Sequence, residues 1–343
     1  MNIEKSLNSL ANRRSDFALT QDMSLEHFQE QVLNESKKSF SSLTEKQRVL
    51  KYLIESMSEV SKHSTDISYE EGNKVLQHLK DELPRYGIFV EFEYQGSVIN
   101  NTHIVNNSDI DLLVITKKFE TLEKPQKPTN PYNGNPIEDM EELRARCIEI
   151  LKSTYSVAKV DTTGSKSITL SGGSLRRDID VVPSNWYNSN KYVKTGIKYY
   201  RGIQIYNCKD KQRDKNYPFW NQKLMNDKDA ATSGNYKSLV RLAKNIRCDS
   251  EIQTVNDISS YDIQALFYHI PSSTICNLKP EDLFFSATKY LENLINNESF
   301  FNSLMVPDQT RKIVKKMSYE QLLLLYNEFC EYEDILSQGV VFL

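Results

Sequence analysis

Residues 93–116 read EYQGSVINNTHIVNNSDIDLLVIT, and a related stretch, RRDIDVVPS, follows at 176–184. In the first stretch a strand-like run ends at the small pair Gly96-Ser97. After a spacer, Asp109 and Asp111 stand inside a second apolar run. Because successive side chains of a strand point to opposite faces, the two aspartates share one face. Adjacent carboxylates repel each other, and the usual reason to keep such a pair is a divalent cation with hard oxygen ligands.

The second stretch supplies a third carboxylate. Asp180 lies in the β-branched run IDVVP, which is typical of a strand. If that strand lies beside the first, Asp109, Asp111 and Asp180 converge, and they suffice to hold two metal ions around a transferring phosphoryl group. Asp178 would face the same way, but Asp180 is preferred because it sits deeper in the apolar run.

These residues together resemble the DNA polymerase β-like nucleotidyltransferase superfamily. The ending Asp180-Val-Val-Pro is similar to the branch that contains oligoadenylate synthetase, cGAS and the bacterial cGAS/DncV-like nucleotidyltransferases (CD-NTases). The resemblance runs from Gly96 to Pro271, roughly half of the chain. It implies an α+β fold, in which a polymerase β-like nucleotidyltransferase core (a mixed sheet with helices) packs on a C-terminal helical lobe. It places the active site in the cleft between the two.

The order of patterns predicts two domains. Residues 1–215 would hold N-terminal helices and the catalytic core, and residues 216–343 the helical, oligoadenylate synthetase-like lobe. The first clear helix is expected to start at Ser42 or Thr44. The remaining expected elements are one or two helices over 44–86, strands within 87–116, a polar loop over 117–136, a helix over 137–154, strands over 157–170, 175–183 and 202–206, a lid over 207–233, and helices from 218 onward.

A basic stripe runs along the predicted helix 234–247. Lys237, Arg241, Lys244 and Arg247 recur at three- and four-residue spacing, opposite an apolar stripe. Such a face can meet a triphosphate, although a solvated basic face is the commoner reading. The resemblance implies that Lys244 meets the nucleotide phosphates, with Arg241 as a second candidate.

Four further residues are candidates for nucleotide binding. Ser97 and the main chain at Gly96 would hold the β- and γ-phosphates, because glycine allows close approach and positive φ. Ser259 or Ser260 is expected to cap the next helix. The pair Ser260-Tyr261 resembles a Ser-Tyr of cGAS-like enzymes, which implies a hydroxyl near phosphate and a ring stacked on a base.

Composition narrows the classes of partner and the cellular location expected for this chain. The chain has 343 residues and a net charge of −3, so a dedicated nucleic-acid binder is disfavoured, although a local basic groove stays open. Five scattered cysteines form no zinc pattern, and there is no clear nucleic-acid-binding motif. The absence of a signal-peptide pattern and of a run of about 20 apolar residues predicts a cytoplasmic protein without a membrane segment.

The predicted activity is a metal-dependent nucleotidyltransferase reaction. Two Mg²⁺ or Mn²⁺ ions are expected per active site, with NTPs as substrates and ATP among them. The resemblance implies a cyclic di- or trinucleotide messenger for bacterial anti-phage defence (CBASS) and a downstream effector that responds to it. Alternatives are NMP transfer to a tRNA, protein or small molecule, linear oligonucleotide synthesis, and a nucleotide-binding pseudoenzyme.

Overall fold

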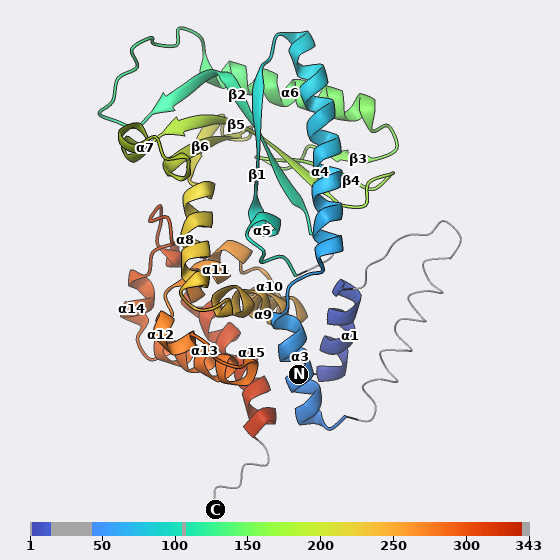
Figure 1. Ribbon diagram of the computed structural model, residues 1–343, viewed down its shortest axis with the longest axis vertical. Helices are drawn as coiled ribbons and strands as arrows, with labels where there is room; N and C mark the ends of the chain where they lie inside the picture. The colour runs from blue at the N-terminus through green and yellow to red at the C-terminus, as the bar shows by residue number, and fades with distance from the viewer. Residues whose placement is uncertain (1, 15–42, 105–107, 338–343) are drawn as a thin grey trace, which may run out of the picture. The chain divides into compact units, whose positions relative to one another are not determined.

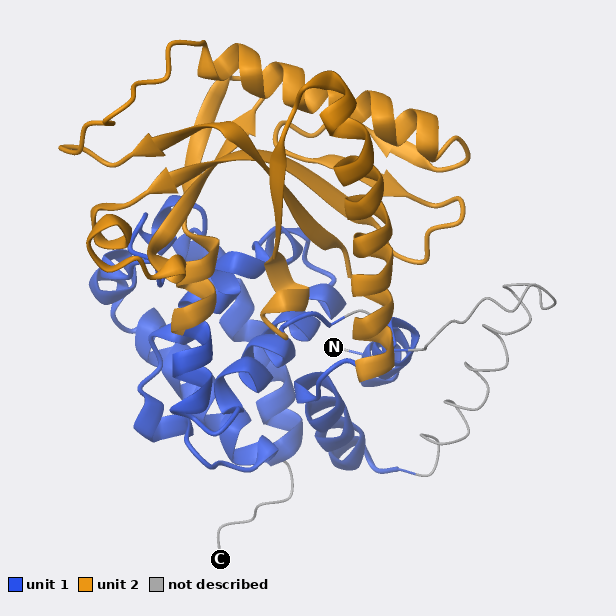
Figure 2. Ribbon diagram, turned by 45° about the horizontal axis from the view of Figure 1, so that its top comes forward, with its two compact units in different colours: residues 1–60, 102–106, 225–343 blue, residues 61–101, 107–224 orange. Residues whose placement is uncertain are grey.

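The computed structural model describes residues 2–14, 43–104 and 108–337. Cα packing divides the chain into two compact units (Figure 2). Unit 1 comprises Met1–Val60, Thr102–Asn106 and Met225–Leu343, and unit 2 comprises Ser61–Asn101 and Asn107–Leu224. The domain boundary expected after residue 215 stays a prediction. Among the described residues, no helix has the length and apolar character needed to span a bilayer.

Unit 2 is built on a mixed sheet. Its main path runs β1-β2-β5-β4-β3, and β6 and β7 continue from β5 (Figure 1). Only the pairing of β2 with β5 is parallel, and the other pairings are antiparallel. The strands are β1 (Val90–Gln95), β2 (Ile110–Leu122), β3 (Lys159–Asp161), β4 (Ile168–Ser171), β5 (Ile179–Asn188), β6 (Arg201–Asn207) and β7 (Gln212–Asn216).

The apolar run of β2 is buried on both faces. Leu112 and Val114 pack in one cluster with residues of α4 (Lys62–Glu82) and α6 (Pro136–Thr154), whereas Leu113 and Ile115 belong to a second cluster. Burial of these side chains removes apolar surface from water and stabilises the central strand pair. Unit 2 also contains η1 (Leu83–Tyr86), α5 (Gly96–Ile99), α7 (Asn190–Thr195), η2 (Lys198–Tyr200) and the first half of α8 (Pro218–Ala230).

The sheet differs from the expected elements in three places. The loop expected from residue 117 is wrong at its start, because β2 continues to Leu122 and pairs with β5 again after a register shift. The single strand expected over 157–170 is two short strands, β3 and β4. β7 lies in the segment expected as a lid, and its polar sequence QRDKN suits the outermost strand, which pairs only with β6.

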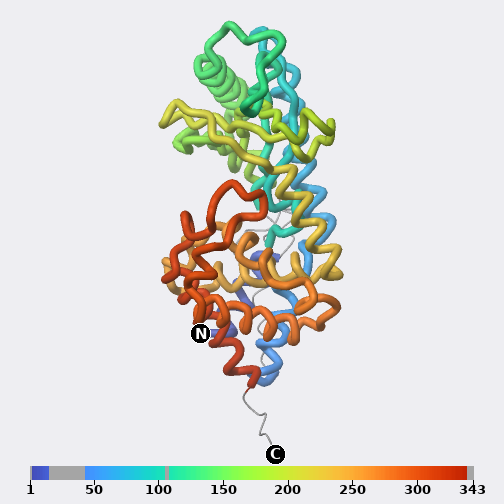
Figure 3. Tube along the Cα trace, turned by 90° about the vertical axis from the view of Figure 1, so that its left-hand side faces the viewer, coloured from blue at the N-terminus to red at the C-terminus, as the bar shows by residue number. Residues whose placement is uncertain are grey.

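Unit 1 is helical. Its core is one apolar cluster drawn from both ends of the chain, including Leu7 of α1, Leu53 of α3 and Leu239 of α9. α13 and α15 lie side by side (Figure 3), with Phe284 and Phe329 stacked at 5.6 Å. The helices are α1 (Ile3–Arg14), α3 (Glu45–Met57), α9 (Asn235–Asp249), α10 (Gln253–Asn256), α11 (Ser260–Tyr268), α12 (Ser272–Ile275), α13 (Pro280–Ile295), α14 (Glu298–Ser303), η3 (Ile313–Lys315) and α15 (Tyr319–Ser337).

Local capping confirms two of the helix starts expected from the sequence. The Thr44 hydroxyl accepts a hydrogen bond from the Gln47 amide, and the Gln47 side chain returns to the Thr44 main chain, so a capping box opens α3. This confirms one of the two expected caps, while Ser42 lies outside the described residues. Ser259 caps α11 in the same way through the Asp262 amide, as expected.

Candidate active site

Asp111 and Asp180 lie opposite each other on neighbouring strands. The parallel register of β2 and β5 pairs their Cα positions directly. Asp109 precedes β2 by one residue and is exposed. Asp178 precedes β5, where its main-chain carbonyl accepts a hydrogen bond from the Ile110 amide at 3.1 Å. The ladder that joins the two strands therefore brings four carboxylates to one end of the strand pair.

The residues before Asp178 are tied to α4. The guanidinium of Arg177 is buried and donates to the Ser64 hydroxyl at 2.8 Å. Arg176 donates to the buried carboxylate of Glu71, also at 2.8 Å. These hydrogen bonds between a helix and the start of β5 hold the strand end that carries Asp180.

Thr169 is a site residue that the sequence reading missed. It pairs with Asp180 across β4 and β5, and its hydroxyl donates to Asp180 Oδ1 at 2.5 Å. The signal was the alternation in Ile168-Thr169-Leu170, which puts the hydroxyl on the opposite face from two buried apolar side chains. Thr169 thereby orients one carboxylate of the cluster.

Burial and neighbouring carboxylates raise the pKa values of Asp109, Asp111 and Asp178. Partial burial, followed by the charges of Asp180 and Asp109, raises the pKa of Asp111 to about 7, against a hydrogen bond with Gln95 that lowers it. Although the Asp109 side chain reaches solvent, desolvation by the surrounding protein, then the charges of Asp180 and Asp178, raise its pKa to about 6. Burial and Asp180 also raise the pKa of Asp178. A concentrated negative potential of this kind favours the binding of a cation.

The donor set fits a hard divalent cation. Carboxylate oxygens on adjacent strands are the ligands that Mg²⁺ and Mn²⁺ prefer. In the described ranges, no three acidic, His or Cys side chains are already arranged as a metal site. The chemistry of Asp109, Asp111 and Asp180 nevertheless suits such a metal.

Gly96 is required by its contact with Asp111. It begins α5 with φ at +90°, in the left-handed region that favours glycine. A Cβ atom at this position would lie 2.0 Å from Asp111 Oδ2, far inside van der Waals contact. The missing side chain at Gly96 therefore leaves room for the Asp111 carboxylate. Ser97 follows Gly96 directly in α5.

The candidate phosphate-binding cations belong to unit 1. Lys244 of α9 is only 4% exposed, and its Nζ donates to the Thr102 carbonyl at 2.6 Å. Burial and the charge of Arg247 lower its pKa to about 8. Arg241, also buried, donates from Nε to the Met57 carbonyl at 2.8 Å. Both cations are already satisfied by oxygens within unit 1.

Ser260 and Tyr261 open α11, also in unit 1. Ser260 Oγ lies 3.4 Å from Arg247 Nη1. The Tyr261 ring packs on the core of unit 1, and the guanidinium of Arg311 lies 5.4 Å from the ring centroid. Burial and Asp308 raise the Tyr261 pKa, so its hydroxyl stays protonated. Gly96, Ser97 and the aspartates are thus gathered in unit 2, and the other four candidates in unit 1.

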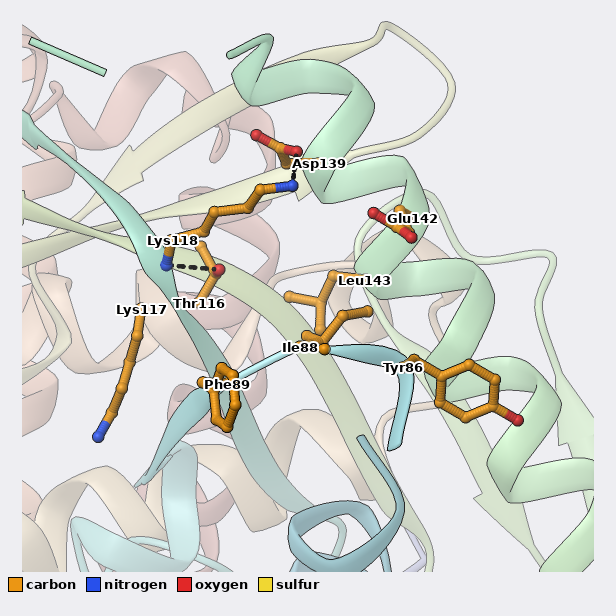
Figure 4. A pocket seen from close by; sticks show the side chains of 10 residues that line it. Tyr86, Ile88, Phe89, Thr116, Lys117, Lys118, Asp139, Glu142 and Leu143 are labelled. Atoms are coloured by element: carbon orange, nitrogen blue, oxygen red, sulfur yellow. Dashed lines mark hydrogen bonds and ion pairs between the residues drawn. The ribbon is translucent and has the colours of Figure 1, made fainter. Parts of the chain in front are cut away.

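A cavity of about 360 Å³ in unit 2 is separate from the carboxylates. Figure 4 shows Phe89, Thr116 and Lys118 among its lining residues, with Lys118 paired to Asp139 of α6. Thr116 lies five residues along β2 from Asp111. The cavity is therefore not part of the acidic site.

The aspartates on adjacent strands, together with the Gly-Ser turn packed against them, define a nucleotidyltransferase of the polymerase β type. Residues 223–327 match the family model of the cGAS/DncV-like nucleotidyltransferase C-terminal helical domain. With the relatives described next, this shows that the chain belongs to the bacterial cGAS/DncV-like nucleotidyltransferases.

The relatives of this chain include proteins named c-di-GMP synthases. One, from a Flavobacteriaceae species, is 34% identical over 282 residues, which cover 75% of this chain and 76% of the relative. Another, from Capnocytophaga granulosa, is 33% identical over 305 residues, covering 80% and 85%. The solved structure of a STING-associated CdnE c-di-GMP synthase from Flavobacteriaceae sp. matches with a TM-score of 0.78 and 28% identity over 99% of both chains.

Proposed function

We propose that this enzyme joins two GTP molecules into cyclic di-GMP and releases two pyrophosphates. The observation that carries the proposal is the direct pairing of Asp111 with Asp180 beside Gly96, which is a site for metal-dependent attack on a nucleotide. The choice of guanine rests on the names of the two relatives. A related protein named cyclic GMP-AMP synthase CdnE03, from Staphylococcus schleiferi, is 31% identical over 197 residues, so a mixed product is the second candidate.

In each of two steps, a ribose hydroxyl attacks the α-phosphorus of a second nucleotide. A new P–O bond forms, the bond to pyrophosphate breaks, and the hydroxyl proton leaves to solvent or a nearby carboxylate. Asp109 and Asp111 would hold the metal at the phosphates, and Asp180 would join them for a second metal at the attacking hydroxyl. Bound metal lowers the pKa of that hydroxyl and neutralises charge on the leaving group.

The chain's own groups bind and orient the nucleotides. The Ser97 hydroxyl donates to the triphosphate, and the missing side chain at Gly96 leaves Asp111 its place. Thr169 keeps one oxygen of Asp180 oriented through its hydrogen bond. Lys244, Ser260 and Tyr261 are the proposed contributors of unit 1 to phosphate and base binding, and Arg241, which donates to the Met57 carbonyl, stabilises unit 1 instead. Positioning and electrostatics then supply most of the rate enhancement.

We place the reaction in the cytoplasm, where NTPs are available. The product would act as a messenger in anti-phage defence (CBASS), read by an effector with a cyclic dinucleotide receptor. One neighbouring structure is of a synthase described as STING-associated, which supports a receptor of that kind.

The test is incubation of the purified protein with each NTP alone and with all four, in Mg²⁺ or Mn²⁺. Phosphatase-treated products are then identified by mass spectrometry, with Asp109→Ala/Asp111→Ala as the control. A phosphatase-resistant cyclic di-GMP from GTP alone, absent in the control, is expected. A cyclic GMP-AMP product would overturn the choice of guanine only. A linear product, or nucleotide transfer to an added tRNA or protein without any cyclic product, would overturn the proposed function.

A further inference from the structure

The connection between α5 and β2 enters unit 1. The chain leaves unit 2 after Asn101, whose φ of +54° makes a sharp left-handed turn. Thr102 is then fully buried, and Ile104 is 3% exposed. Thr102 and Ile104 thus belong to unit 1, together with its helices (Figure 2, blue). Ser97 precedes this segment by five residues and Asp109 follows Thr102 by seven.

Two buried side chains hold Thr102. Lys244 Nζ of α9 donates to the Thr102 carbonyl at 2.6 Å, and Gln264 Nε2 of α11 donates to the Thr102 hydroxyl at 3.1 Å. Lys244 is 4% and Gln264 6% exposed. Buried polar groups of this kind strongly oppose displacement, because a donor that loses its partner cannot turn to water.

We propose that Gln264 and Thr102 form a positioning pair for the reaction, a role that rests on the proposed function. The pair fixes the middle of the only stretch of chain that joins the phosphate-binding Ser97 to the metal-binding Asp109. Lys244 reinforces it through the main chain. If a triphosphate draws Lys244 away from the Thr102 carbonyl, the Gln264 hydrogen bond remains to hold the segment. Gln264 acts through Thr102 and touches neither metal nor nucleotide.

The side-chain hydrogen bond can be removed without changing the shape of the residue. Thr102→Val deletes the acceptor but leaves the carbonyl bonded by Lys244, and Gln264→Met deletes the donor. Thr288→Val is the matched control, since Thr288 is 2% exposed in α13 and its hydroxyl bonds only locally, to the Phe284 carbonyl at 3.1 Å. All three lose one buried hydrogen bond of unit 1, so comparable losses of thermal stability are expected.

The first readout is steady-state kinetics with GTP and Mg²⁺. Thr102→Val and Gln264→Met should each lower kcat about five- to tenfold, the size of one buried hydrogen bond. The double variant should be no worse than the poorer single variant, because both changes remove the same interaction. KM should change less than kcat. A kcat for both variants equal to that of Thr288→Val would overturn the proposal.

The second readout needs no reaction. Amide hydrogen exchange of Asn100–Ile104, measured without nucleotide or metal, should be about five- to tenfold faster in Thr102→Val and Gln264→Met, and unchanged in Thr288→Val. Exchange equal to wild type would overturn the proposal. If wild type makes no cyclic product but exchange responds as expected, the proposed function is wrong. The Gln264–Thr102 hydrogen bond is then still shown to stabilise Asn100–Ile104.

Discussion

The acidic site of unit 2 and the basic helix of unit 1 were both predicted from regular residue spacing. In the structure the acidic side chains are gathered in one place, whereas the basic ones are not. On β2 and β5, alternation and register bring carboxylates together, and their charges help to raise the pKa values of Asp109 and Asp111. On α9, cations at helical spacing are spread over separate partners. Lys244 reaches Thr102, Arg241 reaches Met57, and Arg247 reaches the Ile258 carbonyl at 2.6 Å.

The difference has a geometric cause. Pairing between strands fixes which residues face each other, so a carboxylate on one strand selects its neighbours on the next. A helix presents residues three or four apart along one face, but each long side chain ends wherever its nearest oxygen lies. The carboxylates on β2 and β5 repel each other without a compensating positive charge from the described part of the chain, which indicates a site that requires a cation. Satisfied hydrogen bonds at the helix mark residues that already stabilise the fold.

The largest expected effect is at the strands. Asp111→Asn should lower cyclic dinucleotide formation by about a thousandfold or more, because a neutral amide is a poor ligand for a catalytic divalent metal. The melting temperature should hold or rise, since charge repulsion with Asp180 and Asp109 is removed. Asp214→Asn, which loses only the exposed ion pair with Lys166, is the control and should keep full activity. A variant that retains most of its activity would remove the acidic site from the mechanism.

Gly96 tests how closely the turn and the carboxylate depend on each other. Gly96→Ala should lower activity about a hundredfold, because a Cβ there would push Asp111 away from its place. Backbone strain at φ +90° should add roughly 1–3 kcal/mol of destabilisation.

Gly87→Ala separates these two causes. Its φ of +72° carries a similar backbone penalty, but nothing lies within 4 Å of the added Cβ. It should therefore lose stability and keep its kcat. Equal losses of kcat in Gly87→Ala and Gly96→Ala would mean that the contact with Asp111 has no special role.

The contribution of Asp109 and Asp111 to the stability of the metal-free protein should fall as pH rises from about 4 to about 7. The unfolded aspartates lose their protons near pH 4, whereas Asp109 and Asp111 keep theirs until about 6 and about 7 in the folded state. Folding therefore takes up protons in this window, and stability declines with pH. Asp111 should contribute most, because Asp109 reaches solvent.

Melting temperatures measured from pH 4 to 8 check this decline. Relative to wild type, Asp111→Asn should become progressively more stable as pH rises through the window. Mg²⁺ should raise the wild-type melting temperature more at pH 8 than at pH 5, since binding requires ionised carboxylates. A difference between wild type and Asp111→Asn that does not change with pH would contradict the raised pKa values.

The sequence predicted the parts of the molecule that depend on local pattern. The strands with the aspartates and the cap at Thr44 follow from alternation, apolar runs and capping chemistry, and the α+β class follows from the family resemblance; the structure confirms all three. It missed β7 and the second half of β2, because their polar residues are held by pairing with distant strands. It missed Thr169 for the same reason, since only the pairing of β4 with β5 places that hydroxyl on Asp180.

The sequence also did not predict the hydrogen-bond partners of the cations on α9. The Met57 and Thr102 carbonyls lie far from Arg241 and Lys244 along the chain. The spacing of side chains does not show which main-chain oxygen a given side chain will reach. The triphosphate-binding roles of these two cations stay predictions. Arg241 offers the clearest test of whether such a cation binds phosphate or stabilises the fold.

Arg241→Met is expected to have the smallest effect on the reaction. The guanidinium donates to the Met57 carbonyl and, through Nη2, to the Ser238 hydroxyl at 3.1 Å, so its loss should lower the free energy of unfolding by about 1–3 kcal/mol. KM for GTP should stay within about twofold of wild type, because the Arg241 side chain is buried and its guanidinium is directed to oxygens of unit 1. Chemical denaturation and steady-state kinetics on the same preparation measure both quantities. Lys237→Met is the matched control, since Lys237 is on the same helix and donates to the Asn226 side chain instead of the main chain. A tenfold rise in KM for Arg241→Met, with stability equal to that of Lys237→Met, would show that the basic stripe of α9 behaves like the acidic strands after all, as a site and not as a brace.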